Sequence, residues 1–316
     1  MKFYRLLFPL FLLLICASGF YSDTKSSFSF KETEQGIELF ENGQAVFFYQ
    51  RKPKSSDDKY ICNNYLHPLY SIDGDTLTEE FPADHPFHRG VFWAWHQVFI
   101  NNQSIGDSWI MQNITQDVVG LKTNIQPETA HLELDVNWKS STWQSGKVFL
   151  KEHTNIIVHS LQEDAVRTID FEISLTALVP GVSIGGSDNE KGYGGFSARI
   201  KCPEDLVFTS TYGPVIPKDN QIEAGPWLDF SGTFGPVKKI SGLTLVCHPT
   251  TPNYPAPWIL RQSASMQNIV FPGRERIGLL TDKPIVLRYR IIIHKGTSAN
   301  VDMGRMLSQY EKVYPN

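Results

Sequence analysis

The residues best suited to chemistry lie in one stretch of the chain, between positions 67 and 96. This stretch holds four of the nine histidines, together with an arginine and two tryptophans: His67, His85, His88, His96, Arg89, Trp93 and Trp95. Imidazole titrates near neutral pH, and a guanidinium offers a fork of donors that matches a planar carboxylate or sulfate. The cluster therefore predicts a small-molecule site that binds an acidic ligand and moves a proton.

Three interpretations of this cluster compete. In the first, a metal-free acid-base site uses His85, His88 and Arg89 as catalytic residues, while the ligand contacts His67, Trp95 and His96. In the second, a divalent metal binds His85, His88 and His96, or His248 from a distant CHP element. The positive charge of Arg89 and the lack of an HExxH pattern disfavour a metal, so we expect no cofactor. In the third, the histidines only order a loop.

Two later segments supply further candidates. NEKGYGGFSARI places Tyr193 among glycines, as a proton carrier, and Arg199 at a strand end, as a ligand-binding cation. CHPTTPNYPAPWILRQ adds His248 and Trp258 as ligand-binding residues, with Trp258 as an aromatic platform. The competing interpretation of Trp258 is a place in the hydrophobic core.

The acidic residues near the cluster separate the reaction classes. A glycoside hydrolase needs two carboxylates in defined roles, and Glu79, Glu80 and Asp84 form no paired signature. Elimination beside a uronate carboxylate needs instead a base, a cation and an acid, which His, Arg and Tyr supply. We therefore expect a carbon-oxygen lyase that acts on acidic oligosaccharides. Two alternatives stay open: a hydrolase with carboxylates drawn from Asp84, Asp107, Glu172 and Glu190, and a carbohydrate-binding protein with Trp93, Trp95 and Trp258 as platforms.

The chain resembles the PmoA-like family of secreted Bacteroidetes proteins. The resemblance is carried by HPLYSIDG, FPADHPFHRGVFWAWH, GYGGFSAR, the CHP element with the following PW, and LRYRIIIHKG, in this order. It implies a β-sandwich encoded among carbohydrate-degrading enzymes. In particular, it suggests the oligosaccharide dehydratases of ulvan breakdown, which remove water from a terminal uronic acid and leave an unsaturated sugar.

The elements that must position these residues are almost all strands. Period-two alternation or short β-branched runs recur at 130–140, 147–161, 166–178, 194–202, 243–249 and 285–296, and Asn42-Gly43 marks a hairpin turn. Helical spacing is confined to 301–310. This pattern predicts an all-β protein, a large antiparallel β-sandwich with a short C-terminal helix. The Pro- and Gly-rich stretch 212–236 indicates a long surface excursion. The strand of Trp93 should place Trp93 and Trp95 on one face, and Phe92, Ala94 and His96 on the other.

The N-terminus and the composition bound the location and the partners. Lys2 and Arg5 precede an apolar run and small residues, so residues 1–19 read as a signal peptide cleaved near Gly19, and 20–316 as one domain. We expect a periplasmic or secreted protein, with lipidation at Cys16 left open. The net charge of −4 comes from interspersed residues, which disfavours nucleic acid and membrane partners, apart from that possible anchor.

Overall fold

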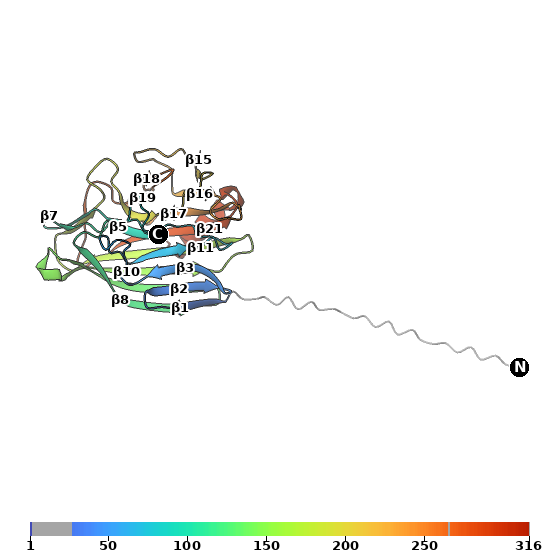
Figure 1. Ribbon diagram of the computed structural model, residues 1–316, viewed down its shortest axis with the longest axis horizontal. Helices are drawn as coiled ribbons and strands as arrows, with labels where there is room; N and C mark the ends of the chain where they lie inside the picture. Colours follow the sequence, from blue (N-terminus) through green and yellow to red (C-terminus); the bar gives the residue numbers. More distant parts are fainter. Residues whose placement is uncertain (2–26, 265, 316) are drawn as a thin grey trace.

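The predicted all-β sandwich is confirmed. The computed structural model describes residues 1, 27–264 and 266–315, so the predicted leader, except for Met1, lies outside the described residues. Antiparallel strands form two large sheets and one small sheet, and a short C-terminal helix lies beside β21 (Figure 1). No helix among these residues is both long and apolar enough to cross a bilayer.

The first large sheet has eight strands and carries most of the predicted site. Asn42 and Gly43 both have positive φ at the turn between its second and third strands, as the Asn-Gly pair predicts. In spatial order the strands are β1 (Phe28–Glu32), β2 (Gly36–Glu41), β3 (Gln44–Gln50), β4 (Tyr65–Leu69), β5 (Val91–Trp95), β13 (Gly194–Ala198), β19 (Gln267–Val270) and β18 (Trp258–Ile259).

The second large sheet has nine strands, several of them long. Its order is β15 (Gly213–Pro214), β14 (Val207–Ser210), β16 (Trp227–Gly232), β17 (Ser241–Cys247), β21 (Ile285–Lys295), β11 (Val166–Ala177), β10 (Val148–His159), β9 (Thr129–Ser140) and β8 (Ile114–Ile125). In β9 every second residue is buried, from Ala130 to Ser140, because one face packs on the core while the other meets solvent.

The remaining elements lie at the margins of these two sheets. A four-stranded sheet has the order β20 (Ile277–Gly278), β12 (Val182–Gly185), β6 (Gln97–Ile100) and β7 (Gln103–Gly106). Two 3₁₀ turns span Gln144–Gly146 and Ser298–Asn300. Helix α1 (Met303–Val313) buries Met306 and Tyr310 against Trp227, Val246 and Ile292 of the nine-stranded sheet.

One hydrophobic core fills the space between the two large sheets and draws residues from Phe28 to Ile293. We call the face of each sheet that meets this core its inner face, and the opposite face its outer face. Trp93 and Trp95 of β5 point to the inner face, whereas Phe92 and Ala94 belong to a separate cluster on the outer face. The predicted alternation of this strand is therefore confirmed.

The stretch 212–236 is not simply a surface excursion, and that expectation is wrong in its second half. Residues 227–232 form β16, a strand buried between β14 and β17. Its polar residue Asp229 is tolerated there because His294 Nε2 lies 2.7 Å from Oδ1 and the Thr244 hydroxyl donates to the same oxygen. The prolines and glycines that precede the strand concealed it in the sequence.

A buried carboxylate connects the two large sheets. Glu152 of β10 projects inward, and its Oε1 accepts hydrogen bonds from Trp93 Nε1 of β5 at 2.8 Å and from Asn64 Nδ2 at 3.0 Å. Oε2 accepts from Trp138 Nε1 at 2.9 Å, and the Thr154 hydroxyl donates to Oε1. Burial raises the pKa of Glu152, against the opposing effect of these four donors.

We predict that Glu152→Ala lowers the free energy of unfolding by at least about 3 kcal/mol, because several buried donors lose their acceptor. Urea denaturation followed by tryptophan fluorescence measures the change. Glu133→Ala is the matched control: Glu133 lies on the outer face of β9 in an exposed pair with Lys122, so its loss should stay within about 0.5 kcal/mol. Equal losses in the two variants would contradict a bridging role for Glu152.

Candidate active site on the outer face of the eight-stranded sheet

The predicted histidine segment folds over the outer face of the eight-stranded sheet. Backbone bridges pair Glu80 with Arg89, and the N–H of Phe81 donates to the carbonyl of His88, so the segment doubles back on itself. Gly90 has a φ of 45°, and a Cβ there would lie 1.9 Å from the Leu66 carbonyl oxygen. Only glycine therefore allows the loop to enter β5 at this point.

Two stacked imidazoles form the tip of this loop. The rings of His85 and His88 lie 4.6 Å apart and almost parallel, and His88 also contacts Phe92 and Trp109 of the outer cluster. His85 Nδ1 donates to Asp84 Oδ2 at 2.7 Å, and the side chain is 38% exposed. Because a carboxylate only accepts, this bond leaves Nε2 of a neutral His85 as an acceptor.

His88 is too deeply placed for the catalytic role expected of it. It is 3% exposed, and burial, together with the charges of His85, Arg199 and Arg89, lowers its pKa to about 2. Its Nδ1 lies 3.3 Å from Arg199 Nη1, which fits an imidazole that accepts a hydrogen bond. His88 therefore stays neutral and supports the loop.

Arg199 is occupied by carboxylates of the chain itself. Its Nε donates to Glu79, and its two terminal nitrogens hold both oxygens of Asp84, at 2.9 and 3.0 Å. Burial alone would raise the pKa of Asp84, but the bonds from Arg199 and His85 outweigh it and lower that pKa to about 2. With 3% of its surface exposed, Arg199 positions the Asp84–His85 pair rather than contacting a ligand.

Arg89 is likewise structural, which corrects its predicted catalytic role. It is 1% exposed and stacks over the Phe92 ring. Its guanidinium donates to the backbone carbonyls of Phe87, Trp109 and Ser108. A planar fork of donors suits this task as well as it suits a bound anion, and the sequence alone does not distinguish the two uses.

A second histidine–aspartate pair, His96 with Asp107, lies on the same face. His96 Nδ1 donates to Asp107 Oδ2 at 2.8 Å, and its ring stacks on Trp109 at 5.0 Å. Trp109 also meets Tyr193, whose hydroxyl accepts a hydrogen bond from Arg261 Nη2 at 2.6 Å. Trp109 is thus the hub that joins His88, His96 and Tyr193, and no spacing pattern in the sequence pointed to it.

The predicted residue His67 lines an open cavity of about 570 Å³. The other lining residues offer a cation, a carboxylate, two amides and one aromatic ring: Lys54, Glu80, Gln35, Gln50 and Phe48, with Pro68 at the edge. Lys54 pairs with Glu80, which also accepts from the Tyr65 hydroxyl at 2.6 Å. An aromatic surface with a few convergent polar groups is typical of a small-molecule pocket.

His67 is neutral in this cavity at physiological pH. Burial lowers its pKa to about 4, with Glu80 opposing the shift and Lys54 reinforcing it. Nδ1 lies 2.9 Å from the hydroxyl oxygen of Thr78, and this hydroxyl also accepts from the Leu69 N–H. The ring is therefore held in place and uncharged, as a proton acceptor at neutral pH requires.

The tryptophans expected at the site lie elsewhere. Trp95 and Trp258 are fully buried in the main core, and their indole N–H groups donate to the carbonyls of Phe271 and Gly225. Trp93 is also buried and donates to Glu152. None of the three presents a ring face to a ligand, so the platform interpretation is wrong for them.

His248 is separated by both sheets from the histidines of segment 67–96. It follows β17 of the nine-stranded sheet, is 1% exposed, and packs against Tyr310 of helix α1 and Tyr314. Its predicted ligand-binding role is therefore not supported by its position. Within residues 27–264 and 266–315, no three side chains of His, Cys, Asp or Glu come together as a possible cation site.

Lys54 and Phe48 are among the residues of the His67 cavity that sequence reasoning missed. Lys54 lies in the RKPKSS loop, and Phe48 looks like an ordinary residue of a hydrophobic hairpin. Neither has a spacing that connects it with His67. Only the packing of β3 beside β4, and the course of the loop between them, place these residues at one cavity.

A protein-family model matches residues 37–307 of the chain. The chain belongs to the DUF6807 family. Its description is a family of unknown function, so membership does not assign an activity, and the resemblance to PmoA-like proteins stays a prediction. No curated protein matches this DUF6807 member significantly.

Similar solved structures are distant from this DUF6807 protein. A putative mutarotase (YeaD) from Salmonella typhimurium has 9% sequence identity and a TM-score of 0.34, with 86% of this chain and 92% of that chain covered. An α-galactosidase (AgaA) from Geobacillus stearothermophilus has 8% identity and a TM-score of 0.31, with 87% of this chain but only 40% of that chain covered. At these low TM-scores the likenesses do not bear on the function.

The buried histidines predict how stability depends on pH. The folded-state pKa values of His67, about 4, and His88, about 2, lie below the unfolded value of 6.5, so the unfolded chain binds more protons below that value. The free energy of unfolding should therefore fall as the pH drops from about 6.5 toward 4. His88→Gln should reduce the slope by about 1 kcal/mol per pH unit, as measured by urea denaturation at pH 4.5 to 8.

The double variant His67→Gln/His88→Gln serves as the internal control for this prediction. It should reduce the pH dependence of the free energy of unfolding by about twice as much as His88→Gln does, since each imidazole contributes separately. An unchanged slope in both variants would show that the two histidines do not titrate as their burial implies.

Proposed function

We propose that this DUF6807 protein is a carbohydrate-active enzyme that acts on an acidic oligosaccharide. The finer assignment is a dehydratase, a carbon-oxygen lyase that removes water from a terminal uronic acid, such as one released from ulvan. The observation that carries the proposal is the His67 cavity, where a neutral imidazole, a cation and an aromatic ring line one open space.

The cation for the uronate carboxylate is Lys54 in this proposal. Arg89 and Arg199 were expected in this role, but both are buried and donate hydrogen bonds to partners within the chain. The Lys54 side chain is 44% exposed, and an ammonium has three donors, so it can serve Glu80 and a second carboxylate together. Placed against that carboxylate, Lys54 would stabilise the enolate-like charge that develops during elimination.

The proton transfer belongs to His67. The imidazole takes the proton from C5, the electrons of the C5–H bond form the C4–C5 double bond, and the C4–O bond breaks. The same imidazole returns this proton to the departing hydroxyl, which leaves as water, so no other proton donor is needed. His85, half-exposed and held by Asp84, is the second candidate for this exchange.

The two alternative functions gain no specific support from the geometry. The carboxylates considered for a hydrolase are dispersed: Asp84 binds Arg199 and Asp107 binds His96 on the eight-stranded sheet, while Glu172 pairs with Arg288 on the nine-stranded sheet. The tryptophan platforms considered for a binding protein are buried.

The proposed activity is tested by incubation with uronic-acid-terminated oligosaccharides from ulvan and from pectin. We expect absorbance from an unsaturated uronyl product, together with loss of one water in mass spectrometry. His67→Gln should reduce kcat at least a hundredfold because the base is lost, and Lys54→Met should raise KM and lower kcat. His131→Gln, on the nine-stranded sheet, is the matched control and should retain activity.

Two outcomes would overturn these assignments. Release of monosaccharide without unsaturation would indicate a hydrolase. Loss of dehydration in His85→Gln, with full activity in His67→Gln, would transfer the proton exchange to the Asp84–His85 pair.

The pH profile gives an independent test of the base. Protonation below a pKa of about 4 would remove the acceptor nitrogen of His67, so the acidic limb of kcat/KM should lie near pH 4 rather than near 6.5. Stopped assays between pH 3.5 and 8, with circular dichroism to follow folding, locate this limb. An acidic limb near 6.5 would exclude His67 as the base.

A further inference from the structure

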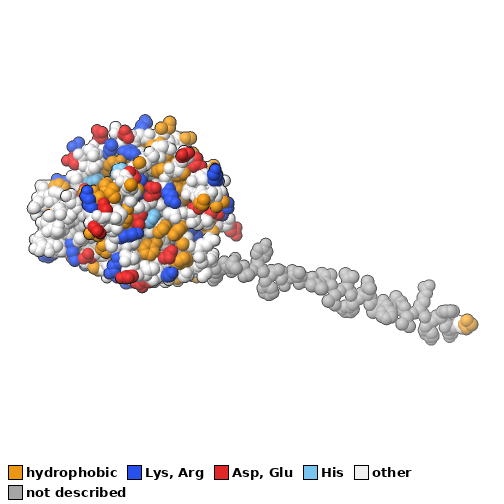
Figure 2. Space-filling model, in the orientation of Figure 1, with side chains coloured by type: hydrophobic (Ala, Val, Ile, Leu, Met, Phe, Trp, Pro, Cys, Tyr) orange, Lys and Arg blue, Asp and Glu red, His pale blue; other side chains and the backbone are white. Residues whose placement is uncertain are grey.

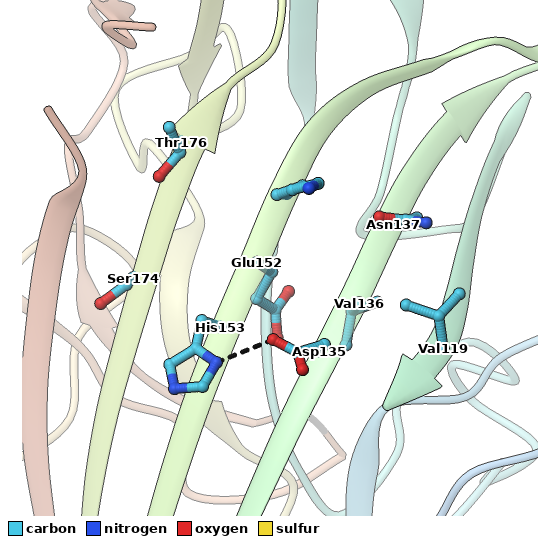
Figure 3. A pocket seen from close by; sticks show the side chains of 9 residues that line it. Val119, Asp135, Val136, Asn137, Glu152, His153, Ser174 and Thr176 are labelled. Carbon is cyan, nitrogen blue, oxygen red and sulfur yellow. Dashed lines mark hydrogen bonds and ion pairs between the residues drawn. The ribbon is translucent and has the colours of Figure 1, made fainter. Parts of the chain in front are cut away.

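The outer face of the nine-stranded sheet is divided into a covered part and an open part. Helix α1 covers the region of β17, β21 and β11 with Met306 and Tyr310. Toward β8 this sheet holds an open groove of about 500 Å³, which spans β8 to β11 (Figure 3). This groove is separate from the His67 cavity because the two lie on opposite faces of the sandwich.

Seven polar residues line the groove, and six of them form its floor in two rows that cross the strands. The seventh, Glu152, directs its carboxylate to Trp93 and Trp138 in the core. The register pairs Asp135 with His153 and His153 with Ser174, which makes one row. The second row consists of Asn137, Lys151 and Thr176, again directly opposite one another. Neighbouring positions are about 5 Å apart across strands and about 7 Å apart along them, so the groups form a regular grid.

Most of the hydrogen-bonding capacity of this grid is unused by the protein. His153 Nδ1 donates to Asp135 Oδ1 at 2.9 Å, drawn as the dashed line in Figure 3. Within the described part of the chain, the side chains of Asn137, Lys151, Ser174 and Thr176 make no hydrogen bond to protein atoms. Amide, ammonium, hydroxyl and carboxylate groups therefore all face one hollow.

The charges of the floor indicate the kind of ligand. Asp135 and Lys151 offset each other, and Glu133 lies 4.0 Å from His153 Nε2, so an acidic ligand gains little there. Among the described residues that line the groove there is no Phe, Tyr or Trp, and Val119 forms an apolar edge. Alternating donors and acceptors at such spacing suit a ligand that carries several neighbouring hydroxyl groups.

We propose that this groove is a second binding site, for a neutral saccharide. The Asp135 carboxylate would accept a hydrogen bond from one sugar hydroxyl, and the Asn137 amide would donate to the adjacent one. The side chains of Lys151, Ser174 and Thr176 would bind the other side of the sugar. The ligand class rests on the proposed carbohydrate function, whereas the site itself rests on the groove. Its role would be to hold the neutral part of a chain whose acidic end reacts elsewhere.

The test uses saturation-transfer-difference NMR and calorimetry of the full mature chain with three neutral probes: cellobiose, maltose and xylobiose. We expect at least one probe to bind the wild type and the His67→Gln variant with equal affinity, because His67 lies on the opposite face of the sandwich. Asp135→Ala/Asn137→Ala should weaken that binding at least tenfold, because two hydrogen bonds, one to a charged group, are lost. Lys122→Ala, an exposed change on β8, is the surface control and should bind as the wild type does.

The outcomes separate this site from the proposed function. Absence of binding by all three probes at 10 mM, roughly the weak limit for a specific sugar site, overturns the groove proposal and leaves the dehydratase proposal standing. Binding that is lost in His67→Gln but kept in Asp135→Ala/Asn137→Ala also overturns the groove proposal, because the sugar then occupies the His67 cavity. Groove binding without dehydration of any uronic acid would instead sustain the groove and refute the dehydratase.

Discussion

The carboxylate of Glu152, buried between the two sheets, is the constraint on which the rest of the structure depends. It comes from β10 of one sheet and accepts from Trp93 of the other, with Asn64 beside it. A charge or proton held at this depth is tolerated only with its hydrogen bonds in place. These bonds lock the inner side of β5 and the chain just before β4, and so determine how both strands present their outer residues.

The hydrogen bonds of Glu152 also determine which residues lie on the outer face of the eight-stranded sheet. With Trp93 held inside, Phe92 and Ala94 point outward and form the floor on which Trp109 and His88 pack. Asn64 precedes β4, the strand that carries His67 to its cavity. Arg89 and Arg199 then bind the loop to this floor through carbonyl and carboxylate partners. Both arginines are therefore used in building the site, and in our proposal the half-exposed Lys54, which also pairs with Glu80, binds the ligand.

The two outer faces of the sandwich differ in character. On the eight-stranded sheet, loops, aromatic rings and histidines make a partly apolar environment in which burial lowers the pKa of His67. On the nine-stranded sheet, the long strands carry a polar grid that keeps its solvent exposure beside helix α1. Over the face shown in Figure 2, acidic and basic side chains are interspersed, as the modest net charge of the chain implies.

The sequence by itself determined several of the long strands, the sandwich and the faces of β5, because alternation of apolar residues is a local property that burial on one side of a sheet enforces. It also identified a loop rich in histidine that does collect His67, His85, His88 and His96 on one face. Only the tertiary structure decided which of these groups meet solvent. Burial and partner choice depend on residues far apart in the chain, as Arg199 with Asp84, Lys54 with Glu80, and His248 with Tyr310 illustrate.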